Sequence, residues 1–197
     1  MKEDRSSGYE DVAAEFLAGR GSTRSVGIGV ATVRSWAGRL PAGATVLDVG
    51  CGPGFPMTSV LIDEGLAVWG VDVAPTFVAA FEQRFPGVPV ACEAVEESSF
   101  FGRRFDAVFS WGLMFLLPPD AQRALIRRFA GILEPGGRLL FTSPPQPITW
   151  HDAMTGEESR SLGAEEYRRL LKAARLAVWD EYEDEGENHY YDAVRGG

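Results

Sequence analysis

A glycine-rich segment that directly follows an acidic residue is the part of this sequence most able to do chemistry. The apolar stretch 46–49 contains Asp48 and is followed by Gly50, Gly52 and Gly54. Glycine lets the backbone turn sharply and approach a ligand, because it has no Cβ. The apolar stretch is typical of a buried parallel strand. The pattern therefore predicts a strand, a ligand-binding turn and the start of a helix.

The glycine spacing distinguishes two classes of nucleotide ligand. In the dinucleotide fingerprint the third glycine lies three residues after the second, so that a pyrophosphate sits on the helix N-terminus. Here that position is Phe55, and the pattern is G-x-G-x-G. The carboxylate of Asp48 would repel a pyrophosphate but suits a cationic amino group. The turn therefore favours a ligand other than a dinucleotide.

The segment from Val46 to Gly54, V-L-D-V-G-C-G-P-G, resembles the first motif of class I S-adenosylmethionine-dependent methyltransferases. The segment from Leu133 to Phe141, L-x-P-G-G-x-L-x-F, is also similar to this family. The resemblance implies an α/β fold: a seven-stranded, mostly parallel sheet with helices on both faces and an antiparallel C-terminal hairpin. We expect one domain over 1–197, with a helical cap over 1–40 and a Rossmann-like core over 44–197.

A second acid is expected at the ribose of S-adenosylmethionine. The apolar stretch 66–71 predicts a buried strand that ends at Asp72, followed by Val73. A carboxylate at this place can accept hydrogen bonds from both ribose hydroxyls, and the resemblance assigns that role to Asp72. The alternative is that Asp72 only caps the helix that begins near Pro75.

The resemblance extends to the rest of the cofactor site. After the short third strand, Glu93 would accept from the adenine amine, and Ala94 or Val95 would donate a backbone N–H to the ring. Ser110, at the end of the predicted fourth strand, completes the set in the core. In the N-terminal helices, Tyr9 and Arg24 resemble the pair that closes over the methyl donor in many small-molecule methyltransferases, although ordinary packing would explain them equally well.

The segment after the fourth strand is informative about the methyl acceptor. Amino-methyltransferases of nucleic acids place N/D-P-P-Y/F here, whereas this chain has Ser110-Trp111-Gly112-Leu113. Several large side chains gather in the segments around the expected site and would suit an aromatic or heteroaromatic acceptor. These predicted substrate-binding residues are Trp36, Trp111, Met114, Phe115, Trp150 and Tyr190.

A hydroxyl, amine or carbon acceptor must also lose a proton. The chain has 2 histidines, His151 and His189, and both are expected near the ligand side of the sheet. Either can act as a general base at neutral pH, although each is also explained as a surface histidine in a polar segment. Positioning alone, or a carboxylate such as Asp152, is the remaining explanation.

Composition limits the partners of the chain. Its 197 residues are 45% hydrophobic and 24% charged, with no apolar run long enough to span a membrane. The net charge of −9 disfavours nucleic acid, which requires a clustered basic surface. The 2 cysteines, Cys51 and Cys92, are too few for a disulfide framework or a structural metal site. We expect no metal, and a monomer or homodimer in the cytoplasm, since the N-terminus lacks a signal-peptide core.

The elements around these residues follow from apolar spacing. Helical spacing predicts amphipathic helices over 6–20 and from about 25 to 39. Alternating residues over 177–183 and 189–195 predict the closing hairpin. We therefore expect a methyltransferase that acts on a small, aromatic or heteroaromatic metabolite, in O-, N- or C-methylation. The alternatives are a protein or nucleic-acid methyltransferase, a non-catalytic S-adenosylmethionine-binding protein and a nucleotide oxidoreductase.

Overall fold

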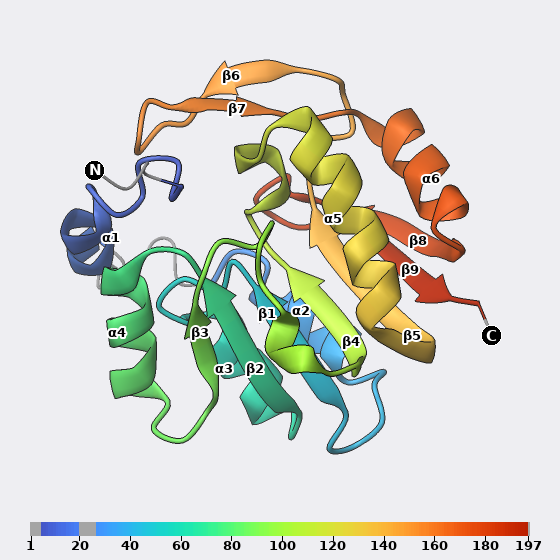
Figure 1. The fold of residues 1–197 in the computed structure, drawn as a ribbon, viewed down its shortest axis with the longest axis horizontal. Helices are drawn as coiled ribbons and strands as arrows, with labels where there is room; N and C mark the ends of the chain where they lie inside the picture. Colours follow the sequence, from blue (N-terminus) through green and yellow to red (C-terminus); the bar gives the residue numbers. More distant parts are fainter. Residues whose placement is uncertain (1–4, 20–26, 197) are drawn as a thin grey trace.

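A seven-stranded sheet forms the centre of the molecule, seen in a computed structural model that describes residues 5–19 and 27–196 (Figure 1). The strand order is β3-β2-β1-β4-β5-β9-β8, in which β9 is antiparallel to both of its neighbours and the other neighbouring pairs are parallel. The strands are β1 (Thr45–Val49), β2 (Ala67–Asp72), β3 (Val90–Cys92), β4 (Phe105–Ser110), β5 (Leu133–Thr142), β8 (Leu176–Glu183) and β9 (His189–Arg195). The expected mostly parallel sheet with a C-terminal hairpin is confirmed.

Helices cover both faces of this sheet. Successive side chains of a strand point to opposite faces, so Val46 packs with the helices of one face and Leu47 with those of the other. On the Val46 side lie α2 (Val30–Ala37) and α3 (Met57–Asp63), and on the Leu47 side lie α5 (Pro119–Ile132) and α6 (Ala164–Ala173). The central strands are therefore buried from both sides, which explains their continuous apolar sequence.

The N-terminal segment is less helical than its sequence suggests. The helix expected over 6–20 is restricted to α1 (Ala13–Gly19), and residues 6–12 form turns. Phe16 of α1 packs on Phe77 of α4 (Pro75–Arg84), with ring centroids 4.9 Å apart. The apolar residues of this segment are therefore explained by packing against α4 as well as by the helical conformation of α1.

Two expectations about the strands are corrected by the structure. The fifth strand begins at Leu133, because Leu133 pairs with Phe105 across an irregularity in the register, and not at Arg138 as the Pro-Gly-Gly sequence suggests. The segment 143–152 is rich in proline, which suggests a loop, but it contains β6 (Thr149–His151), which pairs with β7 (Glu158–Arg160) in a separate hairpin. Within the described part of the chain, no helix has the length and apolar character needed to cross a membrane.

Candidate functional site

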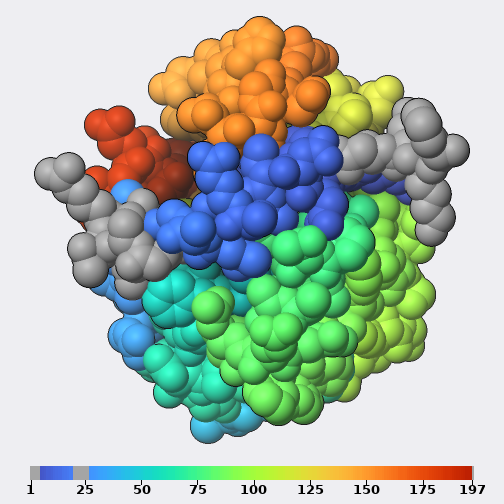
Figure 2. All heavy atoms as spheres, turned by 90° about the vertical axis from the view of Figure 1, so that its left-hand side faces the viewer, coloured from blue at the N-terminus to red at the C-terminus, as the bar shows by residue number. Residues whose placement is uncertain are grey.

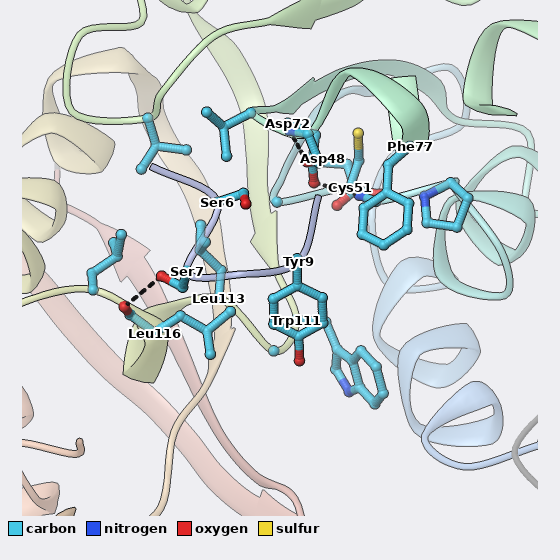
Figure 3. A pocket seen from close by; sticks show the side chains of 18 of the residues that line it. Ser6, Ser7, Tyr9, Asp48, Cys51, Asp72, Phe77, Trp111, Leu113 and Leu116 are labelled. Carbon is cyan, nitrogen blue, oxygen red and sulfur yellow. Dashed lines mark hydrogen bonds between the residues drawn. The ribbon is translucent and has the colours of Figure 1, made fainter. Parts of the chain in front are cut away.

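A cavity of about 320 Å³ lies at the carboxyl ends of β1, β2 and β4. This is the end of an open α/β sheet where ligands bind. Figure 3 shows Asp48, Asp72 and Cys51 close together on one side of this cavity. We call Asp48, Asp72 and the turn 50–54 the floor of the cavity.

Asp48 is a buried acid of the floor. Its side chain points to the same sheet face as that of Val46, toward α3, where the hydroxyl of Thr58 donates to its Oδ2 at 2.6 Å. Asp48 is only 2% exposed. Burial, together with the negative charge of Asp72, raises its pKa to about 7, although the Thr58 hydrogen bond acts in the opposite direction. A cation beside Asp48 would therefore stabilise its ionised form.

Asp72 fixes the backbone around it. Its Oδ2 accepts from the N–H of Gly52 at 2.8 Å, and its Oδ1 accepts from the N–H of Ala74 at 2.9 Å, directly before α4. Burial raises the pKa of Asp72, and these N–H groups oppose that shift. Each carboxylate oxygen has a further lone pair. The helix-capping explanation thus describes part of the bonding of Asp72 and leaves room for a ligand.

The three glycines of the turn serve different purposes. Gly50 and Gly52 line the cavity and both have a positive φ. A Cβ on Gly52 would meet no atom within 4 Å. Gly54 does not line the cavity, and a Cβ there would lie 2.4 Å from Phe85 of the adjacent helix segment. Gly54 is therefore needed for packing, whereas Gly52 leaves space beside the cavity.

The segment after β3 contributes Ala94, Val95 and Glu96 to the cavity, and Val73 also lines it. Glu93, which was expected to read the adenine, does not line the cavity. The acid that does is Glu96, 3.5 Å from the guanidinium of Arg5. The acid of this segment that lines the cavity is thus three positions after the expected one.

The N-terminal residues cover the cavity. Figure 2 shows this blue segment between the orange β6–β7 region and the green α4. It contributes Arg5, Ser6, Ser7, Tyr9 and Phe16 to the lining. Glu10 fixes it to α4, since its carboxylate accepts from Thr76 N–H at 3.1 Å and from Thr76 Oγ1 at 2.6 Å. Arg24, the second residue expected here, lies outside the described residues.

The turn between β6 and β7 completes the covering side. Tyr9 donates its hydroxyl to Asp152 Oδ2 at 3.2 Å, and Asp152 and Met154 both line the cavity. On the other side of the segment, Ser7 Oγ donates to the carbonyl of Leu116 at 3.2 Å, a contact drawn in Figure 3. We call residues 5–12 together with residues 152–154 the roof.

The expected aromatic residues divide between the cavity and the core. Trp111 and Phe115 line the cavity. The indole N–H of Trp111 donates to Tyr190 Oη at 2.9 Å, and Tyr190 in turn donates to Asp184 at 2.8 Å. Trp150 stands behind Phe115, with ring centroids 5.3 Å apart, and does not reach the cavity.

Three more of the expected residues are fully buried and do not line the cavity, namely Trp36, Met114 and Tyr190. Ser110 is also buried and donates its hydroxyl to the carbonyl of Val49 at 3.0 Å, which joins β4 to β1. These four side chains pack in the core of the sheet. They were expected beside a ligand, but none of them lines the cavity.

Neither histidine lines the cavity. His151 is exposed on β6. His189 lies at the start of β9, where its ring nitrogens are 3.2 Å from Glu181 and 3.4 Å from Glu183 on the neighbouring strand. The alternation of β9 points His189 to the same face as Tyr191, with which its ring is in contact. The two side chains expected to remove a proton are therefore not placed beside a ligand in this cavity.

Sequence reasoning missed much of the roof. Ser6, Ser7 and Met154 were not anticipated, because they come from turns whose place depends on tertiary contacts. A usable signal existed for the β6–β7 turn, since Thr155-Gly156 is a typical turn sequence. Cys51 and Pro53 also line the cavity, and both lie inside the glycine motif. Their positions follow directly from that motif.

Comparison with known proteins places these features in a family. A family model described as "Methyltransferase domain" matches residues 46–137. The ubiquinone biosynthesis O-methyltransferase of Xanthomonas axonopodis pv. citri is 36% identical over 149 residues, covering 71% of this chain and 61% of that protein. Aklanonic acid methyltransferase DauC of a Streptomyces species is 39% identical over 111 residues, covering 52% of this chain and 49% of its own length. The chain thus spans about half to three fifths of the length of these relatives.

A solved structure has the same fold. The 1,6-didemethyltoxoflavin-N1-methyltransferase of Burkholderia thailandensis, with 1,6-didemethyltoxoflavin and S-adenosylhomocysteine bound, aligns with a TM-score of 0.74. The alignment covers 95% of this chain and 86% of that one, at 24% sequence identity. The glycine motif, the strand order and the matched family model agree. Residues 46–137 thus belong to the methyltransferase-domain family, and the chain has the fold of S-adenosylmethionine-dependent methyltransferases.

Proposed function

We propose that this chain is an enzyme that transfers a methyl group from S-adenosylmethionine to an oxygen or nitrogen atom of a small molecule. The observation that carries the proposal is the pair of buried carboxylates, Asp48 and Asp72, that line one cavity beside the glycine turn. Carboxylates at the ends of two adjacent parallel strands suit an amino group and a ribose.

The floor fits a cationic donor. The charge that most affects Asp48 among the described residues is that of Asp72, which has the same sign. Two buried carboxylates without a cation are costly, because burial disfavours the charged form. A ligand that brings a positive charge to this floor relieves both the burial penalty and the repulsion.

Each part of the cavity has a role in this proposal. When bound, S-adenosylmethionine supplies a methyl group on a positively charged sulfur. Asp48 would hold its amino group, Asp72 its ribose hydroxyls, and residues 94–96 would contact its base. The roof would exclude water, and Trp111, which also lines the cavity, would orient the acceptor. The reaction is a displacement that depends chiefly on alignment in a dry cavity.

The acceptor is proposed to be a small, aromatic or heteroaromatic molecule. The relatives named above act, by their names, on a ubiquinone precursor and on aklanonic acid. The cavity volume of about 320 Å³ is within the range of small-molecule sites. The roof and the net charge of −9 both disfavour a nucleic acid. A cytoplasmic location and a monomer or homodimer also stay predictions.

Calorimetric titration of the purified chain with S-adenosylhomocysteine and, separately, with NADH tests the proposal. We expect binding of S-adenosylhomocysteine and none of NADH. Mass spectrometry of metabolite mixtures incubated with S-adenosylmethionine should then show an acceptor that has gained one methyl group. Binding of NADH alone would contradict the proposal. Donor binding without methylation of any metabolite, peptide or nucleic acid would instead favour a non-catalytic binding protein.

A further inference from the structure

We propose that Asp152 is a catalytic residue, which takes the proton from a neutral hydroxyl group of the acceptor as the methyl group is transferred. This inference rests on the proposed function. It concerns the turn between β6 and β7, which faces the donor-binding floor across the cavity and supplies Asp152 and Met154 to its lining.

The turn fixes the orientation of the Asp152 carboxylate. Its Oδ1 accepts from the backbone N–H groups of Met154 and Thr155, both at 2.9 Å, and from Thr155 Oγ1 at 3.3 Å. Its backbone N–H donates to the carbonyl of Glu157 at 2.8 Å. One carboxylate oxygen is therefore saturated by the turn, and the second is the one available to a ligand.

That second oxygen, Oδ2, contacts Tyr9, a residue that lines the same cavity. It accepts one hydrogen bond from the Tyr9 hydroxyl, at the long distance of 3.2 Å. A carboxylate oxygen has lone pairs for at least two hydrogen bonds. A hydroxyl group in the cavity can therefore donate to Oδ2 beside Tyr9 without disrupting the turn.

The other ionisable side chains that line the cavity are already occupied by other roles. Within residues 5–19 and 27–196 they are Arg5, Tyr9, Asp48, Cys51, Asp72 and Glu96. Asp48 and Asp72 belong to the donor floor, and Glu96 is paired with Arg5. Burial raises the pKa of the Cys51 thiol, which keeps it protonated and so unable to take a proton. Asp152 is the lining carboxylate that remains for the acceptor.

The proposed step is balanced in atoms and charge. A lone pair of the acceptor oxygen forms the new O–C bond, the S–C bond of the donor breaks, and its electron pair returns to sulfur. The O–H proton passes to Asp152 Oδ2. The products are a methyl ether, neutral S-adenosylhomocysteine and a protonated Asp152, which returns its proton to water when the cavity opens.

The neighbouring residues define the class of acceptor. Met154, Phe115 and Leu116 line the same cavity as Asp152, and they are apolar. The floor and Asp152 together present three carboxylates, which would repel an acidic acceptor. These features favour a neutral hydroxyarene, whose ring contacts the apolar side chains and whose hydroxyl meets Asp152.

Three variants of the full chain test the role of Asp152. Asp152→Asn keeps an oxygen that can accept the N–H groups of the turn, but it cannot take a proton. Asp152→Ala removes the whole carboxylate and allows rescue by added formate. The matched control is Glu157→Gln, which alters an exposed carboxylate of the same turn that does not line the cavity. The acceptors are catechol, pyrogallol and hydroquinone, with aniline and ortho-phenylenediamine as amine analogues.

We expect methylation of at least one of the phenols, a fall in kcat of about 100-fold or more in Asp152→Asn, and an unchanged affinity for S-adenosylhomocysteine. Formate should restore part of the kcat of Asp152→Ala and leave the wild type unaffected. Glu157→Gln should keep the wild-type rate.

Several outcomes would overturn the role of Asp152. They are a kcat within about threefold of wild type in Asp152→Asn, a failure of formate rescue, or methylation of the amines but of no phenol. Binding of S-adenosylhomocysteine without methylation of any probe would also overturn it. In all of these cases calorimetry would still show donor binding. Failure of the proposed function is recognised separately, because the wild-type chain would then not bind S-adenosylhomocysteine.

Discussion

The floor and the roof of the cavity are constructed differently. In the floor, Asp72 is held by two backbone N–H groups and Asp48 by the hydroxyl of a core helix, and both acids are at most 9% exposed. In the roof, the N-terminal segment is joined to the β6–β7 turn by the Tyr9–Asp152 hydrogen bond of 3.2 Å and to α4 by Glu10. A rigid surface thus faces one that is attached by a few side-chain contacts.

This difference matches two requirements of a methyltransferase, which are to bind the donor and to bind the acceptor. The donor is the same molecule for every member of the family, so a fixed floor with backbone-bound carboxylates can serve it. The acceptor differs between enzymes, and the roof consists of turns, where substitutions disturb fewer core contacts. Changes in the floor should therefore alter donor binding strongly, whereas changes in the roof should alter acceptor turnover and the rates of entry and exit.

The largest effect is expected at Gly52 of the floor. Gly52→Val places a β-branched residue at a φ of +53° beside the cavity, where its side chain would occupy the space of the donor. We expect affinity for S-adenosylhomocysteine to fall by at least about 100-fold in calorimetry, with the fold retained by circular dichroism. Gly102→Val is the matched control, because Gly102 has a φ of +63° with open space around it but lies outside the cavity. Equal donor affinity in the two variants would contradict the role of the glycine turn.

The next effect concerns the ribose. Asp72→Ala removes a charged acceptor and should weaken donor binding by about 1–3 kcal/mol. The control Asp63→Ala removes an exposed acid at the end of α3 and should bind the donor normally. Calorimetry compares the two. An unchanged affinity in Asp72→Ala would show that the ribose is held by other groups.

A pH dependence should distinguish Asp48 from the roof acids. Because the pKa of Asp48 is raised to about 7 in the ligand-free protein, its carboxyl is largely protonated below that pH and cannot attract a cation fully. Donor affinity should therefore rise with pH up to about 7, by as much as about tenfold per unit, and then level off. Asp48→Asn should bind weakly at every pH. A flat profile in the wild type would exclude contact between Asp48 and a cationic group.

The same shift has the opposite effect on the stability of the ligand-free protein. The folded state binds the Asp48 proton more tightly than the unfolded state, in which the carboxyl has its ordinary pKa of 3.8. Unfolding therefore becomes easier as pH rises from about 4 through about 7. Thermal unfolding of wild type and Asp48→Asn over this range checks the prediction, since the variant should lose this part of the pH dependence.

The smallest effect is expected in the roof. Glu10→Ala removes the two hydrogen bonds that Thr76 donates to Glu10, so the roof should open more often. We expect S-adenosylhomocysteine to dissociate a few-fold faster in stopped-flow measurements, with a loss of stability of about 1 kcal/mol or less. Glu15→Ala, an exposed acid of α1, is the control. A loss of donor affinity as large as that of Asp72→Ala would break the proposed division between floor and roof.

The floor can be predicted from the sequence and most of the roof cannot. Asp48 and Gly52 belong to one short motif, and the strand that leads to Asp72 is recognised by its apolar residues, so local pattern determines their place. Asp152 and Tyr9 are 143 positions apart in the chain and meet only because α1 docks on α4. The histidines were misleading for the same reason, since register and strand alternation direct His189 toward Glu181.

The attachment of the roof to α4 has a consequence for the order of binding. Asp72 accepts from the N–H of Ala74, and two residues later the N–H of Thr76 donates to Glu10. A continuous path of hydrogen bonds and backbone therefore leads from the proposed ribose-binding acid to the covering segment. A donor seated on Asp72 steadies the segment that forms one side of the acceptor space. The kinetics should therefore be ordered, with S-adenosylmethionine binding before the acceptor and S-adenosylhomocysteine leaving last. Product inhibition by S-adenosylhomocysteine should accordingly be competitive with the donor and noncompetitive with the acceptor.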